Sequence, residues 1–139
     1  MLTPSELNKT IAEKFPGHLG ISITAVDGQQ MIAEFDIAEH HMATNGYLHA
    51  GSVVSLADTA CGLGCSVNLP AGADGFTTVE LKSNHLGTAR EGKVVCVAKA
   101  LHLGKSTQVW DAEVKHQQSG KVIAMFRCTQ MILYSDKNS

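Results

Sequence analysis

The sequence predicts an α+β domain in which a long, curved antiparallel sheet surrounds one apolar helix. The first observation is the stretch of small and apolar residues at 50–68, whose length favours a helix over a strand. The second is the C-terminal half, which predicts four long strands separated by glycine-bearing turns, at residues 76–86, 93–103, 107–116 and 122–133. No linker, repeat or low-complexity segment divides residues 1–139, so we assign them to one domain.

A short helix and a hairpin are expected before the long helix. Thr3 and Glu6 stand at capping-box spacing, which starts a helix, and the Pro-Gly pair ending at Gly17 is expected to end it. Residues 20–26 and 31–37 then alternate between apolar and polar side chains, and an Asp-Gly pair joins them. This pattern predicts a β-hairpin.

The composition excludes several classes of protein. Charged residues make up only 17% of the chain, whereas about 25% is usual, and the hydrophobic fraction of 44% is enough for a real core. The net charge of -2 argues against a nucleic-acid-binding module. No apolar run approaches the ~18 residues of a membrane span. Residues 1–15 lack the apolar block of a signal peptide, so we expect a cytoplasmic protein that contacts neither nucleic acid nor membrane.

Several predicted strands are apolar on both faces, as in residues 94–98 and 123–126. Strands of this kind need cover on both sides of the sheet. One helix can cover only one face, so we expect a second subunit to cover the other. The sequence therefore predicts a homodimer or a homotetramer.

The four cysteines show no spacing typical of a metal site. None of Cys61, Cys65, Cys96 and Cys128 forms a pair separated by two residues, the spacing that zinc sites usually contain. Each lies in an apolar stretch, which indicates reduced, buried thiols. We therefore expect no metal.

One carboxylate interrupts the apolar helix. Asp58 is the single formally charged residue between His49 and Asp74. Burying a carboxylate costs several kcal/mol unless something compensates. The side chain is therefore either a structural Asp bonded to a backbone amide or hydroxyl, or a functional carboxylate facing a cleft; we favour the second, because Asp is a poor residue in the middle of a helix.

The residues before the helix add a second chemical feature. A polar, glycine-bearing segment runs from Asn45 to Gly51, and Gly51 is expected near the helix N-terminus, where free N–H groups and the dipole favour negative charge. Gly51 and Asp58 lie about two turns apart, on roughly one face. Carbonyl chemistry uses this combination of an oxyanion-stabilising end and a nearby base or nucleophile.

These residues resemble a known family. The segment 45–62, with its His49-Ala50-Gly51 and Leu56-Ala57-Asp58 motifs, is similar to the signature of hotdog-fold acyl-coenzyme A thioesterases of the PaaI-like, phenylacetate-degradation type. Residues 77–82, 89–92 and 102–105 are similar to the strand motifs of that family. The resemblance implies a hotdog fold, an acyl-CoA substrate and hydrolysis of the thioester without a cofactor.

The resemblance also implies catalytic roles for particular residues. Asp58 would activate water or attack the thioester, and Gly51 would donate its N–H to the thioester carbonyl. His49 would position the thioester or the loop. A hydroxyl on the first strand after the helix reaches the site in related enzymes, in many cases from the partner subunit; Thr78 aligns best with it and Thr77 second.

Substrate-binding roles follow from the same resemblance. Lys105 and Ser106, in a turn, would lie near the coenzyme A phosphates or pantetheine, with Arg90 as a second cation. Many relatives have an Asn or Gln six residues before the signature His, where this chain has Ala43. Asn45 is therefore a weaker candidate for that role.

Two other functions stay open. One alternative is a hotdog hydratase-dehydratase that acts on enoyl or hydroxyacyl thioesters. In such enzymes the pattern resembles an Asp followed five residues later by a His, or a paired His and Glu. This chain has Leu63 five residues after Asp58, which counts against this alternative. The other alternative is a non-catalytic acyl-CoA-binding module, in which Asp58 would have no evident purpose. The acyl group, aromatic or aliphatic, is not defined by the sequence.

Overall fold

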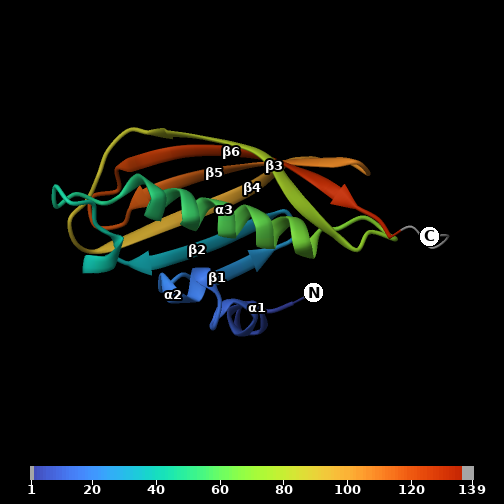
Figure 1. Ribbon diagram of the computed structural model, residues 1–139, viewed down its shortest axis with the longest axis horizontal. Helices are drawn as coiled ribbons and strands as arrows, with labels where there is room; N and C mark the ends of the chain where they lie inside the picture. The colour runs from blue at the N-terminus through green and yellow to red at the C-terminus, as the bar shows by residue number, and fades with distance from the viewer. Residues whose placement is uncertain (1, 136–139) are drawn as a thin grey trace.

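The computed structural model describes residues 2–135, which form two short helices, a long helix and six strands (Figure 1). In chain order they are α1 (Pro4–Ile11), α2 (Phe15–His18), β1 (Ser22–Asp27), β2 (Gln30–Asp36), the 3₁₀ turn η1 (Glu39–His41), α3 (Ala50–Val67), β3 (Gly75–His85), β4 (Lys93–Leu103), β5 (Thr107–His116) and β6 (Val122–Leu133). The long helix, the hairpin and the four long strands predicted from the sequence are confirmed.

The six strands form one antiparallel sheet in the order β1-β2-β4-β5-β6-β3. The sheet curves around α3, and α1 and α2 lie beside β1 at one edge of this layer (Figure 1). A sheet wrapped around a single helix is the predicted α+β architecture, the hotdog fold. Its geometry leaves one side of α3 uncovered by the sheet.

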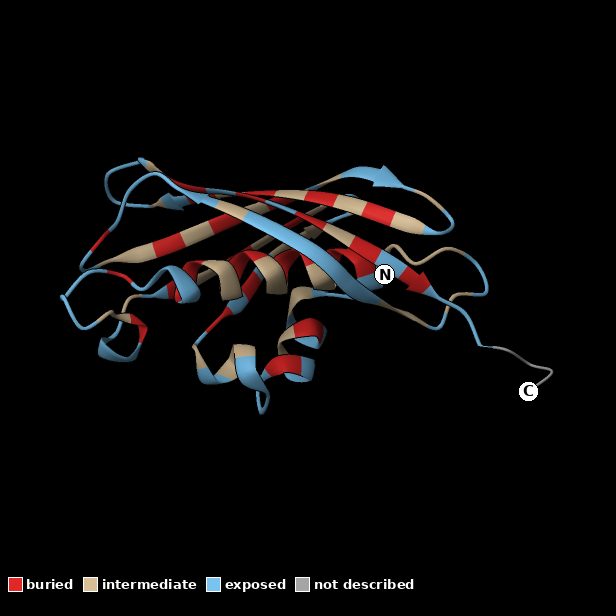
Figure 2. Ribbon diagram, turned by 45° about the horizontal axis from the view of Figure 1, so that its top comes forward, coloured by how far each residue is buried: buried red, intermediate tan, exposed pale blue. Residues whose placement is uncertain are grey.

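The core lies between α3 and the concave face of the sheet. On α3 the buried residues fall on the side that faces the sheet, whereas the opposite side is only partly covered (Figure 2). The ring of Trp110 on β5 is fully buried and packs directly on Gly64. An added Cβ at Gly64 would lie 2.6 Å from the ring, so this close approach of helix and sheet requires glycine.

The N-terminal segment differs from the prediction. The first helix ends at Ile11, and Pro16-Gly17 does not end it but lies within α2. Proline is tolerated in the first turn of a helix, where its missing N–H has no intrahelical partner. The Asn8 side chain exchanges two hydrogen bonds with the backbone of Ile23, at 2.7 and 2.9 Å, which attaches α1 to β1.

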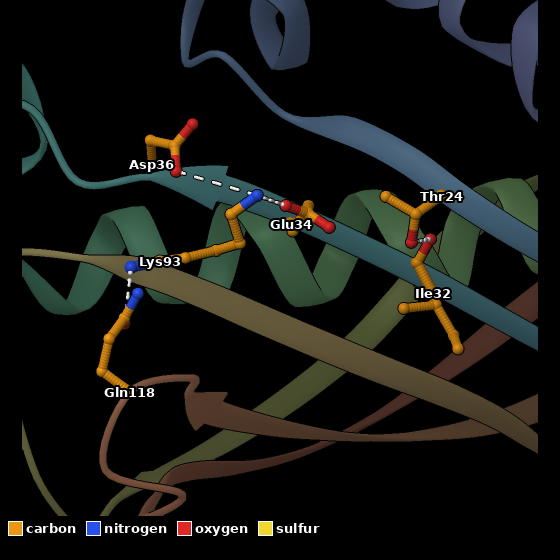
Figure 3. Close-up of polar contacts among 6 residues, drawn as sticks. All are labelled: Thr24, Ile32, Glu34, Asp36, Lys93 and Gln118. Atoms are coloured by element: carbon orange, nitrogen blue, oxygen red, sulfur yellow. Dashed lines mark hydrogen bonds and ion pairs between the residues drawn. The ribbon is translucent and has the colours of Figure 1, made fainter.

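Polar contacts tie the convex side of the sheet together (Figure 3). The Lys93 ammonium pairs with Glu34 and lies 3.8 Å from a carboxylate oxygen of Asp36, so β4 is linked to β2. The Gln118 side chain accepts the Lys93 N–H at 3.0 Å, which attaches the β5–β6 turn to the start of β4. Ion pairs near the protein surface contribute little to stability.

Strand β3 lies at the free edge of the sheet, and most of its residues are exposed (Figure 2). A β-bulge at Val79 interrupts its pairing with β6. The bulge places Thr78 on the concave side of the sheet and turns Glu80 and Lys82 to the convex side, although the alternation of the sequence puts all three on one face. Val79 is 52% exposed and Leu81 is 42% exposed, so the edge strand carries apolar surface.

Helix α3 has the length and composition of a membrane span. With 18 residues and a mean hydropathy of 1.3, it is the one helix within residues 2–135 that passes this test. The expectation that no stretch approaches such a length is therefore wrong. The helix packs against the concave face of the sheet, the position of a core helix in a globular domain.

Candidate active site

The uncovered side of α3 is a strip that follows the helix axis, with Gly51, Ser55, Asp58, Gly62 and Ser66 along it. Two hollows open on this strip. The central hollow has a volume of about 250 Å³ and lies between the α1–α2 corner, the middle of α3 and the start of β3. The N-terminal hollow has a volume of about 270 Å³ and lies over the first turn of α3, lined by residues that include Phe15, His40, His49 and Gly51.

Asp58 lines the central hollow together with Phe76 and Thr78 of β3. Its carboxylate is half-buried, and Oδ1 is a buried oxygen with no hydrogen-bond partner among the described residues. Because burial disfavours the charged form, the pKa of Asp58 is raised above its usual value. A structural carboxylate should be satisfied by hydrogen bonds, so this geometry favours a functional carboxylate facing the hollow.

Thr78 and Asp58 line the central hollow from one chain, and Thr59 and Ser66 are the other hydroxyl residues in its wall. Thr78 Oγ1 donates a hydrogen bond of 2.6 Å to Oε1 of Gln130, a fully buried side chain on β6. Thr77 pairs with Met131 and lies on the convex side of the sheet, so the structure does not bring it to Asp58. The sequence reasoning missed Gln130, whose contact with Thr78 spans 52 residues of the chain.

His49 caps the N-terminus of α3. Its Nδ1 accepts the Gly51 N–H at 2.8 Å, so the ring proton is on Nε2 and is free to be donated. The Gly51 N–H, predicted to meet the thioester carbonyl, is thus already occupied. The Ala50 N–H, in the same turn, makes no hydrogen bond to another described residue. This turn therefore offers one free backbone donor and one imidazole donor beside the N-terminal hollow.

His41 connects the N-terminal corner to the turn that carries His49. Its Nδ1 accepts the Ala38 N–H at 2.9 Å, and its Nε2 lies 2.6 Å from the Leu19 carbonyl oxygen. The backbone oxygen of His41 accepts the His49 N–H at 2.9 Å and the Ser52 hydroxyl at 2.8 Å. Burial lowers the pKa of His41, and its Nδ1–Nε2 pattern is that of a neutral ring.

The predicted substrate-binding residues do not converge within one chain. The Arg90 guanidinium lies 4.4 Å from the centroid of the Tyr47 ring, near the start of α3. Lys105 and Ser106 line a separate hollow with Pro70, just beyond the other end of α3. The two ends of the 18-residue helix α3 are about 27 Å apart, since each residue of an α-helix adds about 1.5 Å. Figure 1 shows that the β3–β4 connection, which carries Arg90, and the β4–β5 turn, which carries Lys105 and Ser106, lie at opposite ends of this helix.

Asn45 lines neither of the two hollows on the strip. Its Oδ1 accepts the Tyr47 N–H at 3.1 Å, the local contact of an Asx turn. In this structure Asn45 shapes the loop before α3 and lies in an exposed position.

The four thiols are not nucleophiles of this site. All four cysteines are free and buried, as predicted. A hydrogen bond with Cys128, together with burial, raises the pKa of Cys61 well above its usual value, and burial raises those of Cys65 and Cys96 to about 12. Within residues 2–135, no group of three or more His, Cys, Asp or Glu side chains is arranged to hold a metal ion.

The hotdog fold and this cleft define a class of enzymes that act on thioesters, and comparison with known proteins agrees. Residues 45–123 match the thioesterase superfamily. A 1,4-dihydroxy-2-naphthoyl-CoA hydrolase of Listeria monocytogenes is 32% identical over 111 residues, which is 80% of this chain and 89% of that protein. The chain belongs to the thioesterase superfamily.

Solved structures show the same architecture. A thioesterase of Haemophilus influenzae superposes with a TM-score of 0.92 at 28% identity, covering all of this chain and 96% of that one. A Staphylococcus aureus thioesterase superposes with a TM-score of 0.80 at 28–29% identity, over 84–85% of this chain and 96–97% of that one, in two variants that replace a glutamate or a glutamine by alanine. The protein is accordingly an enzyme, a thioester hydrolase.

Proposed function

We propose that this protein hydrolyses an acyl- or aryl-CoA thioester to the free acid and CoA, as a PaaI-like member of its family. The observation that carries the proposal is Asp58, a half-buried carboxylate that faces an apolar hollow and has no hydrogen-bond partner within residues 2–135. A raised pKa together with a place in a cleft is typical of a general base. The free donors at the start of α3 supply the complementary charge for a developing oxyanion.

In the proposed reaction, the thioester carbonyl oxygen accepts hydrogen bonds at the first turn of α3. The Ala50 N–H and the His49 Nε2–H are its donors, and the Gly51 N–H holds the His49 ring in place. Asp58 takes a proton from water, and the water oxygen bonds to the carbonyl carbon. The C–S bond then breaks as Asp58 gives that proton to the leaving sulfur, which regenerates the carboxylate and releases the free acid and the CoA thiol. Direct attack by Asp58 would instead give a mixed anhydride, which acid quenching and peptide mass spectrometry would detect on Asp58.

The relatives support the position of the carboxylate and the choice of CoA. The Listeria monocytogenes relative is named as a CoA-thioester hydrolase. In the Staphylococcus aureus thioesterase, the replaced glutamate follows the replaced glutamine by the same number of residues that separates Asp58 from Ala43. We therefore assign Asp58 to the place of that glutamate, with alanine in the place of the glutamine.

The central hollow is the proposed site for the acyl group. Its wall combines Ile11 and Pro16 of the N-terminal corner with Leu63 and Phe76. A hollow of about 250 Å³ with this lining suits a compact aromatic or medium aliphatic group. The N-terminal corner thus belongs to the substrate cleft as well as to the fold.

We also propose a homodimer formed through the β3 edge, or a tetramer built from such dimers, in the cytoplasm. Two β3 strands that pair antiparallel would cover the apolar side chains Val79 and Leu81. Their α3 helices would then run in opposite directions. That arrangement would bring Arg90 of one copy toward Lys105 of the partner subunit, which accounts for two cation positions at opposite ends of one helix. Sedimentation at micromolar concentration tests this, and a monomer would contradict it.

The test of the function is a thiol-release assay with a panel of acyl-CoA thioesters, including aryl, short and medium aliphatic chains. Hydrolysis produces free CoA thiol. A hydratase would instead remove the enoyl absorbance of an enoyl-CoA without thiol release, and a binding module would do neither. Thiol release from at least one thioester supports the proposal, and its absence across the panel contradicts it.

A further inference from the structure

Two glutamines are fully buried in the core and face each other across β5 and β6. Gln108 and Gln130 are register partners, and both are 0% exposed. Gln108 serves the core: its amide N–H bonds the Asn68 carbonyl at 2.9 Å, and its oxygen accepts the indole N–H of Trp110 at 2.8 Å. Gln130 instead bonds a side chain of the central hollow, Thr78. Gln108 is therefore a structural amide of the core, whereas the amide of Gln130 is linked to the candidate site.

The direction of the bond between Thr78 and Gln130 decides what Thr78 offers the hollow. The Gln130 Nε2 group donates to the Cys128 sulfur at 3.4 Å, which leaves Oε1 facing Thr78. The Thr78 hydroxyl proton is donated to that oxygen at 2.6 Å. A hydroxyl has one proton and two lone pairs, so Thr78 Oγ1 can only accept a hydrogen bond from anything bound in the hollow.

We infer that Gln130 is a positioning residue that makes Thr78 a hydrogen-bond acceptor for the attacking water. This inference rests on the proposed hydrolysis. The water donates one hydrogen to the Asp58 carboxylate and the other to Thr78 Oγ1. Both of its hydrogens are then held away from the substrate, and an oxygen lone pair faces the thioester carbonyl. Without Gln130, the Thr78 proton is free to point into the hollow and bind that lone pair instead.

The test compares substitutions that remove each partner while keeping its size. Thr78→Val removes the hydroxyl, and Gln130→Met removes the acceptor oxygen. Each is expected to lower kcat about tenfold, the worth of one neutral hydrogen bond, with KM within about twofold of the wild type. In the double variant Thr78→Val/Gln130→Met, kcat is expected to be no lower than in Thr78→Val alone, because Gln130 acts only through Thr78.

Gln108→Met is the matched control, since it deletes the same amide from an equally buried neighbour with no contact to the hollow. It is expected to lower the unfolding temperature but to leave the kcat of the folded protein unchanged. Gln130→Glu is a second variant that keeps an acceptor oxygen. Burial raises the pKa of such a carboxyl, so the uncharged acid accepts the Thr78 proton and restores most of the kcat lost in Gln130→Met.

The outcomes separate this inference from the proposed function. A wild-type protein that releases no thiol from any thioester contradicts the function itself. If the wild type is active, additive losses in the double variant overturn the inference. Equal kcat losses in Gln108→Met and Gln130→Met overturn it as well, as does a Gln130→Glu variant as slow as Gln130→Met.

Discussion

The two sides of α3 carry glycines two positions apart that meet opposite environments. Gly64 faces the sheet, where an added Cβ would lie 2.6 Å from the fully buried ring of Trp110. Gly62 faces the strip, where the same atom would meet only the edge of Phe76, at 3.3 Å. On the sheet side a glycine allows close packing, and on the strip side it leaves space beside Asp58. One helix thus divides packing and chemistry between its two faces.

Replacing the glycine on the packed side should have the largest effect on stability. In Gly64→Ala, the new methyl group displaces Trp110 in a close-packed core, and the gain in helix propensity only partly offsets this. We expect a net loss of about 1–2 kcal/mol in the free energy of unfolding. Denaturant titration measures the loss, and the kcat of the folded fraction should stay near the wild-type value. A variant as stable as the wild type would contradict the tight contact.

On the strip side of α3, the ionisation of Asp58 should control the pH dependence of the reaction. Asp58 must be ionised to take a proton, and burial raises its pKa above the ordinary value of about 3.9. As the pH falls below the raised pKa, kcat/KM should fall tenfold per pH unit. The pH profile measures where this acidic limb lies. A midpoint at or below the ordinary value would show that a different group is the base.

His41 connects the N-terminal corner to the turn before α3 and should make stability depend on pH. Its pKa in the folded state is lowered by burial, so its contribution is fully present above the unfolded value of about 6.5 and is lost as the pH falls toward the folded value. We expect the wild type to lose more stability than His41→Gln between pH 7 and pH 5, because burial disfavours the protonated ring of His41. Denaturant titrations of both proteins at the two pH values give this difference, and equal losses would contradict the role of His41.

The smallest effect is expected at the glycine on the strip. The edge of the Phe76 ring can move by a few tenths of an ångström, so Gly62→Ala should change stability by less than about 1 kcal/mol. The added methyl group narrows the central hollow. The ratio of kcat/KM for short over bulky acyl groups should therefore rise a few-fold. An unchanged ratio across the thioester panel would place the acyl group elsewhere.

Most of the fold could be predicted because its signals are local. Turn glycines divide the strands, and the length of the apolar stretch marks α3. The end of α1 could not be predicted in this way, because a Pro-Gly pair suits both the end of one helix and the first turn of the next. The face of each β3 residue was also beyond reach, since the bulge at Val79 leaves no pattern in the sequence.

The candidate site was predictable only in part, because only some of its features leave a local signal in the sequence. Asp58 stands out as a lone charge in an apolar helix, and Thr78 follows from family resemblance. Gln130 contacts Thr78 from a strand that lies 52 residues away in the sequence. In the sequence it looks like any other polar residue near a strand end. The occupation of the Gly51 N–H by His49 depends on a side-chain rotamer, and the separation of Arg90 from Lys105 depends on the sheet topology. Contacts of these kinds are set by the three-dimensional fold and leave no local pattern in the sequence.

The central claim is that one face of α3 packs against the sheet and the other carries the chemistry. Its most direct test is Asp58→Asn, measured for stability and activity at pH 7. The substitution removes a half-buried charge that no described residue compensates, so the unfolding temperature should be unchanged or higher. The kcat/KM for thiol release should fall at least about 100-fold, because the general base is lost. A folded Asp58→Asn protein that keeps the wild-type kcat/KM would contradict the account.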